Sequence, residues 1–296
     1  MSQDDLLEEL RRLIQVDPGG RGLARLPGPN LFTACAADLT AACRRLAALK
    51  VPSRIGLFTG FYIASAGAGE TDGPPGAILL AHALEGLGHA VTFFSDPHTL
   101  PALRLAARRL RLAAPLLNLA DIDPWGVEHH DFDVLIAIER PGPAADGVLR
   151  SMTGRDISPF HGPAHVWFAR SPVPTIGVGD GGNEIGMGKL PSELIADHIP
   201  LGREIACRTA TTELIVAGVS NWGGYALAAG VLACTARWDL ARRLDPRAET
   251  ELWAEVIPAA GLVNAATGRA ELAVDGLDWS TYIRPLTRMH ELLARR

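Results

Sequence analysis

Five short apolar runs constrain the fold of this chain more than any other feature of its sequence. They occupy residues 54–58, 90–94, 134–138, 175–178 and 214–219. Apolar residues on consecutive positions, many of them β-branched or aromatic, are typical of strands that are buried on both faces of a parallel sheet. We therefore expect these runs to be adjacent buried strands.

Helical patterns alternate with these runs at residues 76–87, 100–112 and 225–236. The alternation predicts an α/β fold with a mainly parallel, Rossmann-like three-layer sheet and helices on both faces. Further helices are expected at residues 2–16, 33–49, 250–256 and 281–293, and a hairpin at 262–274. No repeat or linker interrupts the sequence, which favours a single domain over residues 1–296 with the helical segment 1–50 packed on the core.

Composition excludes several classes of protein. The 296 residues are 48% hydrophobic and 21% charged, which suits a large buried core. The net charge of −5 argues against a nucleic-acid partner, because a general nucleic-acid binder needs a basic face. Four cysteines without a CxxC pair argue against a disulfide scaffold or a Cys-rich zinc site and fit a reducing compartment. The first ten residues contain four acids, unlike a targeting peptide, so we expect a cytoplasmic protein.

The stretch 214–236 carries no charge for 23 residues, which is long enough to cross a membrane. Its middle reads Ser220-Asn221-Trp222-Gly223-Gly224, which is polar and turn-forming. A buried strand, a turn and a buried helix explain this stretch better, so no membrane partner is expected. The apolar helix could help to form a homodimer, although a core helix needs no partner.

Polar clusters follow all five expected strands. In open parallel sheets, ligands bind at the carboxyl ends of the strands. Thr59 and Gly60 follow the first run, and Glu139 and Arg140 follow the third. Turn chemistry explains Gly, Asp and Asn but does not require charged residues such as Glu139 and Arg140. We therefore expect a functional crevice at these strand ends.

The segment 177–189 contains six glycines in thirteen residues. Exposed amides in such a loop can form an anion-binding nest. The loop is not a Walker A motif, because Leu190 rather than Ser or Thr follows Lys189. Asp180, Asn183 and Glu184 could hold a metal ion through their oxygen atoms, or Asp180 and Asn183 could simply cap turns.

Two further motifs have both structural and functional interpretations. Asp72 precedes a helix that begins with two prolines, and it could cap this helix. The nearby Glu70 is not needed to start the helix, which favours a functional role for it. Arg140 could bind a carboxylate with two hydrogen bonds or pair with its neighbour Glu139. His161 and His165 are expected at the surface, because Gly162 and Pro163 prevent a helix that would align their rings.

Together, the motifs around Thr59-Gly60-Phe61, 70–77, 138–142, 179–189 and 220–223 resemble the D-glutamate cyclase family. They are most similar to the C-terminal domain of the mitochondrial type, which also occurs alone in bacteria. The resemblance implies reversible cyclisation of D-glutamate to 5-oxo-D-proline with loss of water. Larger members carry a preceding hydro-lyase-like domain, and we expect none in this chain. Where an Asp-Gly pair is expected, Asn264 and Ala265 stand, whereas Asp275-Gly276 fits.

This chemistry requires a base, an acid and groups that hold two carboxylates, so we expect a small acidic substrate. Arg140 would clamp the α-carboxylate, Lys189 with the loop amides would stabilise the oxyanion, and Glu184 or Asp72 would be the base. The expected substrate-binding residues are Thr59, Gly60, Glu70, Glu139, Gly181, Gly182, Asn183 and Asn221. Asp180 and Glu184 could hold Mg²⁺ or Mn²⁺, and no organic cofactor is expected.

Two alternatives remain open from the sequence. The first is a metal-dependent enzyme that acts on a phosphorylated or nucleotide ligand held by the glycine loop. The second is a sensor that binds a small acid without turnover.

Overall fold

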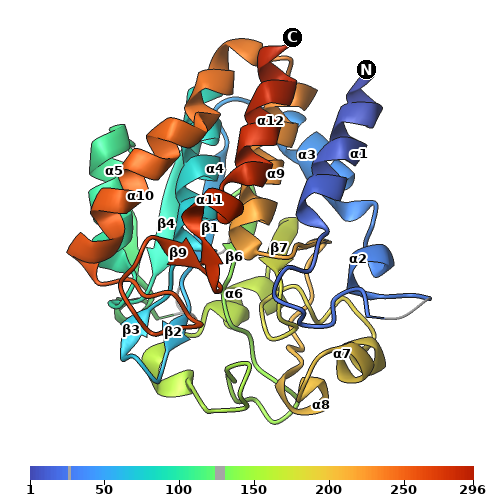
Figure 1. Ribbon diagram of the computed structural model, residues 1–296, viewed down its shortest axis with the longest axis vertical. Helices are drawn as coiled ribbons and strands as arrows, with labels where there is room; N and C mark the ends of the chain where they lie inside the picture. The colour runs from blue at the N-terminus through green and yellow to red at the C-terminus, as the bar shows by residue number, and fades with distance from the viewer. Residues whose placement is uncertain (26–27, 124–130) are drawn as a thin grey trace.

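The computed structural model describes residues 1–25, 28–123 and 131–296, and its centre is a parallel sheet of six strands (Figure 1). In spatial order the strands are β5 (Leu116–Asn118), β4 (Ala90–Ser95), β1 (Arg54–Thr59), β6 (Val134–Ile138), β7 (Thr175–Gly179) and β8 (Glu213–Val216). From β1 the strands continue through β4 to β5 on one side, whereas β6, β7 and β8 follow on the other side, where β6 pairs with β1. The direction of strand order therefore reverses between β1 and β6. In open α/β sheets, ligands bind at this switch point.

The sheet is buried on both faces, as the apolar runs predict. Ile55 and Leu57 of β1 join the core on one face, whereas Phe58 joins a separate aromatic cluster on the other. All five expected strands are confirmed, although the last one ends at Val216 rather than at residue 219. The sequence reading missed β5, which is short and lacks a fully buried residue.

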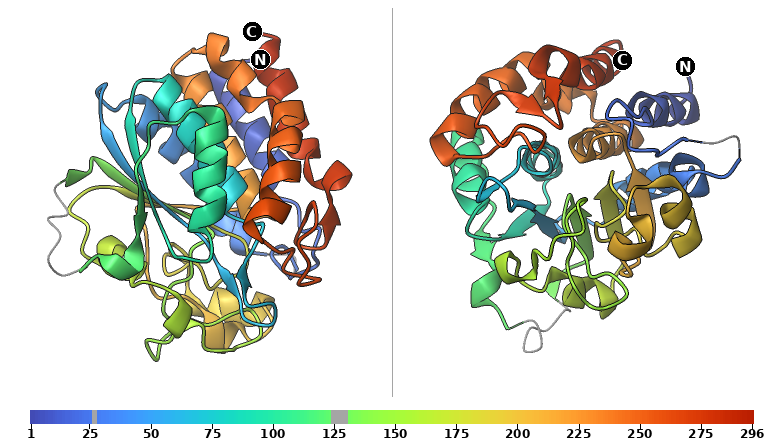
Figure 2. Two further views of the ribbon diagram at one scale, coloured as in Figure 1. Left: turned by 90° about the vertical axis from the view of Figure 1, so that its left-hand side faces the viewer. Right: turned by 60° about the horizontal axis from the view of Figure 1, so that its bottom comes forward.

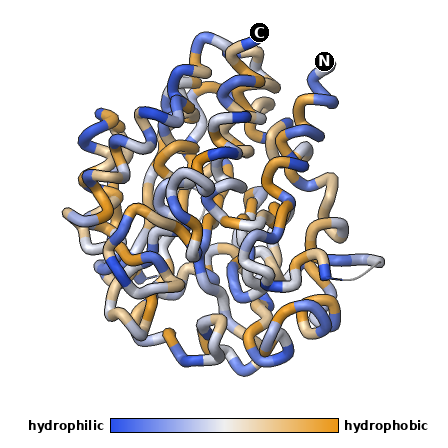
Figure 3. Tube along the Cα trace, viewed as in Figure 1, coloured by the Kyte–Doolittle hydropathy of each residue, from blue (hydrophilic) through white to orange (hydrophobic). Residues whose placement is uncertain are grey.

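One face of the sheet is covered by α4 (Pro74–Gly86) and α9 (Ser220–Cys234), which pack against each other (Figure 2). Beside them, α3 (Asp38–Ala47) packs on the edge strand β8 and α5 (Leu100–Leu110) packs on the opposite edge strand β5. A further layer outside these helices consists of α1 (Gln3–Ile14), α10 (Pro246–Ala260) and α12 (Arg284–Ala294). Along α1 and α12, hydrophilic and hydrophobic stretches of the trace alternate, because each turn of an amphipathic helix passes through a polar and an apolar face (Figure 3). A capping box of Ser2 and Asp5 starts α1.

The opposite face is covered by α6 (Ala164–Ala169), whose Trp167 and Phe168 pack on Phe58 of β1. Helices α7 (Ser192–His198) and α8 (Gly202–Ile205) extend this side. The predicted three-layer α/β architecture with helices on both faces is therefore confirmed.

The remaining short elements connect these layers. They are α2 (Leu31–Ala34), β2 (Tyr62–Ile63), β3 (Ala68–Gly69), β9 (Ala273–Val274), β10 (Leu277–Asp278) and α11 (Trp279–Tyr282), with 3₁₀ turns at Leu119–Asp121, Ser158–Phe160 and Trp238–Leu244. The expected helix 33–49 is broken between α2 and α3. The antiparallel pair β9–β10 turns at Asp275-Gly276 rather than at residues 267–269, where the structure has an isolated bridge between Asn264 and Arg269.

The expected turn at Ser220–Gly224 is wrong, because these residues form the first turns of α9. Glycine suits position 224 because α4 and α9, the two inner helices, approach each other backbone to backbone. A Cβ on Gly224 would lie 2.8 Å from the backbone of Gly76. Nearly the whole of α9 is buried inside the molecule. In the part of the chain that the structure describes, no helix is long and apolar enough to span a bilayer.

A buried acid in the helical layer predicts a pH-dependent stability. Glu249 accepts hydrogen bonds from Tyr225 Oη (2.8 Å) and Trp253 Nε1 (2.9 Å), and burial raises its pKa from 4.5 to about 7. A raised folded-state pKa gives stability that is complete below the unfolded value and is lost as pH rises through 7. As pH rises from 4.5 to 8, the free energy of unfolding of Glu249→Gln should therefore increase by about 3 kcal/mol relative to that of the wild type.

Urea denaturation of both proteins at several pH values measures this gain. Glu251→Gln, on the exposed side of the same helix, is the control. The difference between its free energy of unfolding and that of the wild type should change little with pH. A difference between Glu249→Gln and the wild type that is constant across this pH range would contradict the prediction.

Candidate active site

The two inner helices cap each other at the sheet's switch point. Asp72, just before α4, accepts hydrogen bonds from the backbone amides of Ser220 (2.9 Å) and Asn221 (2.8 Å) at the start of α9. In return, Asn221 Oδ1 accepts from the amides of Gly73 (2.9 Å) and Gly76 (2.8 Å) at the start of α4. Asp72 and Asn221 thus satisfy the orphan donors of both helices and fix their approach.

The glycine loop after β7 is closed by its own acid. The carboxylate of Glu184 accepts hydrogen bonds from the amides of Asp180 (3.1 Å), Gly181 (2.6 Å) and Gly182 (2.8 Å). These are the amides expected to bind an anion or an oxyanion, and here Glu184 occupies them. This arrangement disfavours a phosphate at the loop, because a phosphate would have to displace a buried carboxylate.

A cavity of about 270 Å³ opens beside these strand ends. Its volume lies just below the range of about 300–1,000 Å³ that is common for drug-sized ligands, so a ligand of amino-acid size fits it better. One wall is the hairpin region 61–65, and another is the segment 151–155. The floor carries five acids, and these are Glu70, Glu139, Asp180, Glu184 and Asp275.

Three of these carboxyls have strongly shifted acidity. Burial, followed by the charges of Asp275 and Asp72, raises the pKa of Glu70 well above its usual value. Burial also raises the pKa of Glu139, with Asp180 as the largest charge contribution. The pKa of Asp180 is raised by burial as well, although the charge of Arg21 opposes this shift. Burial and neighbouring acids favour the protonated form of each of these carboxyls, which suits groups that give up or take up a proton during a reaction.

Glu70 differs from its neighbours in having no partner. Only 5% of the residue is exposed, and no donor among the described residues forms a hydrogen bond or ion pair with its carboxyl group. By contrast, Glu139 accepts a hydrogen bond from Ser220 Oγ, and Asp72 and Glu184 accept backbone amides. The carboxyl group of Glu70 lines the cavity with its hydrogen-bonding capacity unused, so a ligand in the cavity could contact it.

Two cavity acids also sit on strained backbone. Glu139 has φ +45° and Asp275 has φ +52°, in the left-handed region that residues other than glycine rarely adopt. Such strain is concentrated at functional sites, where surrounding structure holds it. At Asp275, the turn is supported by Asn264 Oδ1, which accepts the amide of Gly276 (2.9 Å).

Sequence reasoning missed three charged residues of the site, Arg21, Arg155 and Asp275. The guanidinium of Arg21 bridges Asp180 (2.6 Å) and Asp275 (2.8 Å). Asp17 holds the loop that carries Arg21 by accepting the amides of residues 21–23. The sole sequence signal for these residues is the Asp275-Gly276 pair, which fits the pattern of the D-glutamate cyclase family.

Several expected site residues lie outside the cavity. The ammonium of Lys189 binds the carboxylate of Asp38 and the carbonyl of Thr212 (2.6 Å). Thr59 is fully buried, and the carbonyl of Gly60 faces the Arg140 side chain. Asn183 does line the cavity, where its Nδ2 donates to the carbonyl of Arg150 (2.7 Å).

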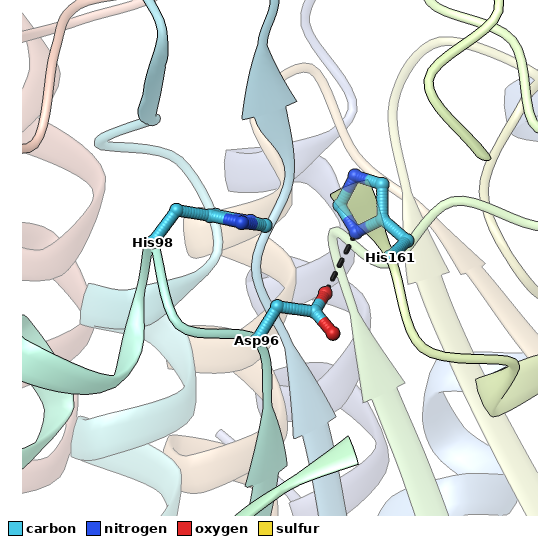
Figure 4. A group of neighbouring side chains, drawn as sticks. All are labelled: Asp96, His98 and His161. Atoms are coloured by element: carbon cyan, nitrogen blue, oxygen red, sulfur yellow. Dashed lines mark hydrogen bonds and ion pairs between the residues drawn. The ribbon is translucent and has the colours of Figure 1, made fainter. Parts of the chain in front are cut away.

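Arg140 is fully buried in a polar cluster behind the hairpin rather than in the cavity. It pairs with Asp96 and donates to the carbonyl of Gly162 (2.8 Å). Asp96 also accepts from His161 Nδ1 (2.7 Å), as Figure 4 shows, while His161 Nε2 accepts the amide of Tyr62 (3.3 Å). The expectation of a surface His161 is therefore wrong, because Asp96 gives this ring a buried partner. His165 lies on α6 and is half-buried.

This cluster resembles a metal site in composition, since Asp96, His98 and His161 approach one another closely. However, both oxygens of Asp96 and both nitrogens of His161 already have partners. The positive charge of Arg140 would also repel a cation. The cluster therefore ties the hairpin to β4.

Comparison with known proteins agrees with the motifs. A family model described as "D-glutamate cyclase-like, C-terminal" matches residues 10–290. The chain belongs to the D-glutamate cyclase-like family. It is 33% identical over 254 residues to human "D-glutamate cyclase, mitochondrial", an alignment that covers 77% of this chain and 39% of the human protein. The chain thus spans less than half the length of this D-glutamate cyclase.

Proposed function

We propose that this chain interconverts D-glutamate and 5-oxo-D-proline in the acidic cavity. The observation that carries the proposal is Glu70, a buried carboxyl with a raised pKa that has no partner among the described residues and lines a cavity of amino-acid size. Membership of the D-glutamate cyclase-like family supports the reaction class. The human relative is a much longer protein, so its activity is part of the proposal for this chain.

The cavity offers complementary charges for such a substrate. An α-ammonium group suits the acidic floor, whereas carboxylates suit Arg21 and Arg155, the two arginines that line the cavity. Arg155 is exposed and belongs to the wall formed by residues 151–155. These residues take the roles that the sequence assigned to Arg140 and Lys189.

The reaction needs proton transfer at two atoms. The α-nitrogen loses two protons and attacks the side-chain carboxyl carbon; a C–N bond forms, a C–O bond breaks, and both protons leave in the water. Glu70 would accept a proton from the nitrogen, and a protonated Glu139 would donate one to the departing oxygen. In the reverse direction the two roles exchange.

A divalent cation fits the same floor and belongs to the proposal. Asp180 shares one close group of carboxylates with Asp72 and Asp275, and a second with Glu139 and Glu184. Ionised carboxylates keep further lone pairs after accepting amides, and oxygen ligands suit Mg²⁺ or Mn²⁺. Such an ion would polarise the substrate carboxyl group.

The purified chain is expected to form 5-oxo-D-proline from D-glutamate, and the reverse, with L-glutamate as the control substrate. Chromatography of both compounds, with and without Mg²⁺ or Mn²⁺, measures the reaction. Absence of turnover in both directions by folded protein would contradict the proposal. Stabilisation by D-glutamate without turnover would support the sensor alternative instead.

A further inference from the structure

Arg21 is the counter-ion of the acidic cavity. Of the two arginines in the cavity wall, it alone forms ion pairs with the floor among the described residues, through Asp180 and Asp275. These two acids are also two of the three carboxylates in one of the groups that could hold a cation. A guanidinium and a divalent ion therefore compete for the same oxygens, because both need the same negative charge.

The single positive charge of Arg21 does not balance the acids of the cavity floor. Glu70 is only 5% exposed, and none of the described residues donates a hydrogen bond to its carboxyl group. A doubly charged ion would neutralise the acids better than Arg21 does.

The side chain of Arg21 is held less firmly than that of Arg140. Its side chain keeps 22% exposure and reaches the floor from a loop whose backbone is held separately by Asp17. Arg140, in contrast, has a fully buried side chain fixed by Asp96 and by the carbonyl of Gly162. Release of the Arg21 side chain therefore requires no change in the fold around it.

We propose that Arg21 is an exchangeable counter-ion: a divalent cation displaces it from Asp180 and Asp275, and the freed guanidinium binds a carboxylate of the substrate. The inference rests on the proposed function for its second half. Metal and substrate then assist each other, because the metal frees the residue that the substrate needs. Each ligand should tighten binding of the other by the same factor.

Titration of Mn²⁺ against the full chain, followed by electron paramagnetic resonance of the free ion, tests the exchange. Arg21→Met should bind Mn²⁺ about tenfold more tightly than the wild type, because the competitor is gone. Arg155→Met removes an equal charge from the same cavity without breaking an ion pair and should change the affinity less than about threefold. D-glutamate should tighten Mn²⁺ binding in the wild type but not in Arg21→Met.

Equal or weaker binding by Arg21→Met, or an equal gain in Arg155→Met, would overturn the exchange. Lack of Mn²⁺ binding by both proteins would also overturn it, while the cyclisation assay decides the proposed function separately. The wild type provides a test that needs no variant: Mg²⁺ should speed modification of Arg21 by butane-2,3-dione relative to Arg155. Unchanged labelling would count against displacement.

Discussion

Asp96→Asn is expected to lower the free energy of unfolding by about 3–5 kcal/mol, because it leaves the charge of Arg140 buried without a counter-charge. The Arg140 side chain is fully buried and pairs with Asp96. Burial disfavours the ionised Asp96, but Arg140 and His161 outweigh this cost and lower its pKa. The stabilisation from Asp96 is therefore present at neutral pH and is lost as pH falls through this lowered value.

Urea denaturation followed by circular dichroism measures the loss. Asp146→Asn is the matched control, because it breaks a solvent-exposed ion pair with Arg150, and it should lower the free energy of unfolding far less than Asp96→Asn does. If the two variants were equally stable, the cluster in Figure 4 would not hold the fold as we describe.

Glu70→Gln is expected to reduce turnover of D-glutamate by about 100- to 10,000-fold, the usual contribution of a positioned acid or base. Glutamine keeps the size of the side chain but cannot exchange the proton. Steady-state kinetics in both directions measures the effect. Glu251→Gln, on the exposed surface of α10, should keep wild-type rates.

The same variant separates a functional role from a structural one. A neutral amide avoids the repulsion and burial that raise the pKa of Glu70, so Glu70→Gln should be at least as stable as the wild type at pH 8. Lower activity together with equal or higher stability is the signature of a functional acid. Activity within tenfold of the wild type would remove Glu70 from the mechanism.

The sequence allowed prediction of the residue types at the site better than their roles. Glu70, Glu139, Asp180 and Asn183 line the cavity as expected, because polar residues after parallel strands converge on one edge. Lys189 was distinctive as one of two lysines in the chain, yet it pairs with Asp38 outside the cavity. Rarity in composition carries no information about where a side chain points.

By itself, the sequence determined the buried parallel sheet and the edge where the acids gather, because both follow from local apolar runs and from the residues next to them. Only the tertiary structure decided which of those groups are free to react. Glu184 closes its own loop, Asp72 and Asn221 cap helices almost 150 residues apart, and Arg140 pairs with Asp96. Arg21 and Asp275 reach the cavity from opposite ends of the chain. Hydrogen bonds and ion pairs between distant segments leave no periodic signal in the sequence, so the free carboxyl of Glu70 became evident only in the folded chain.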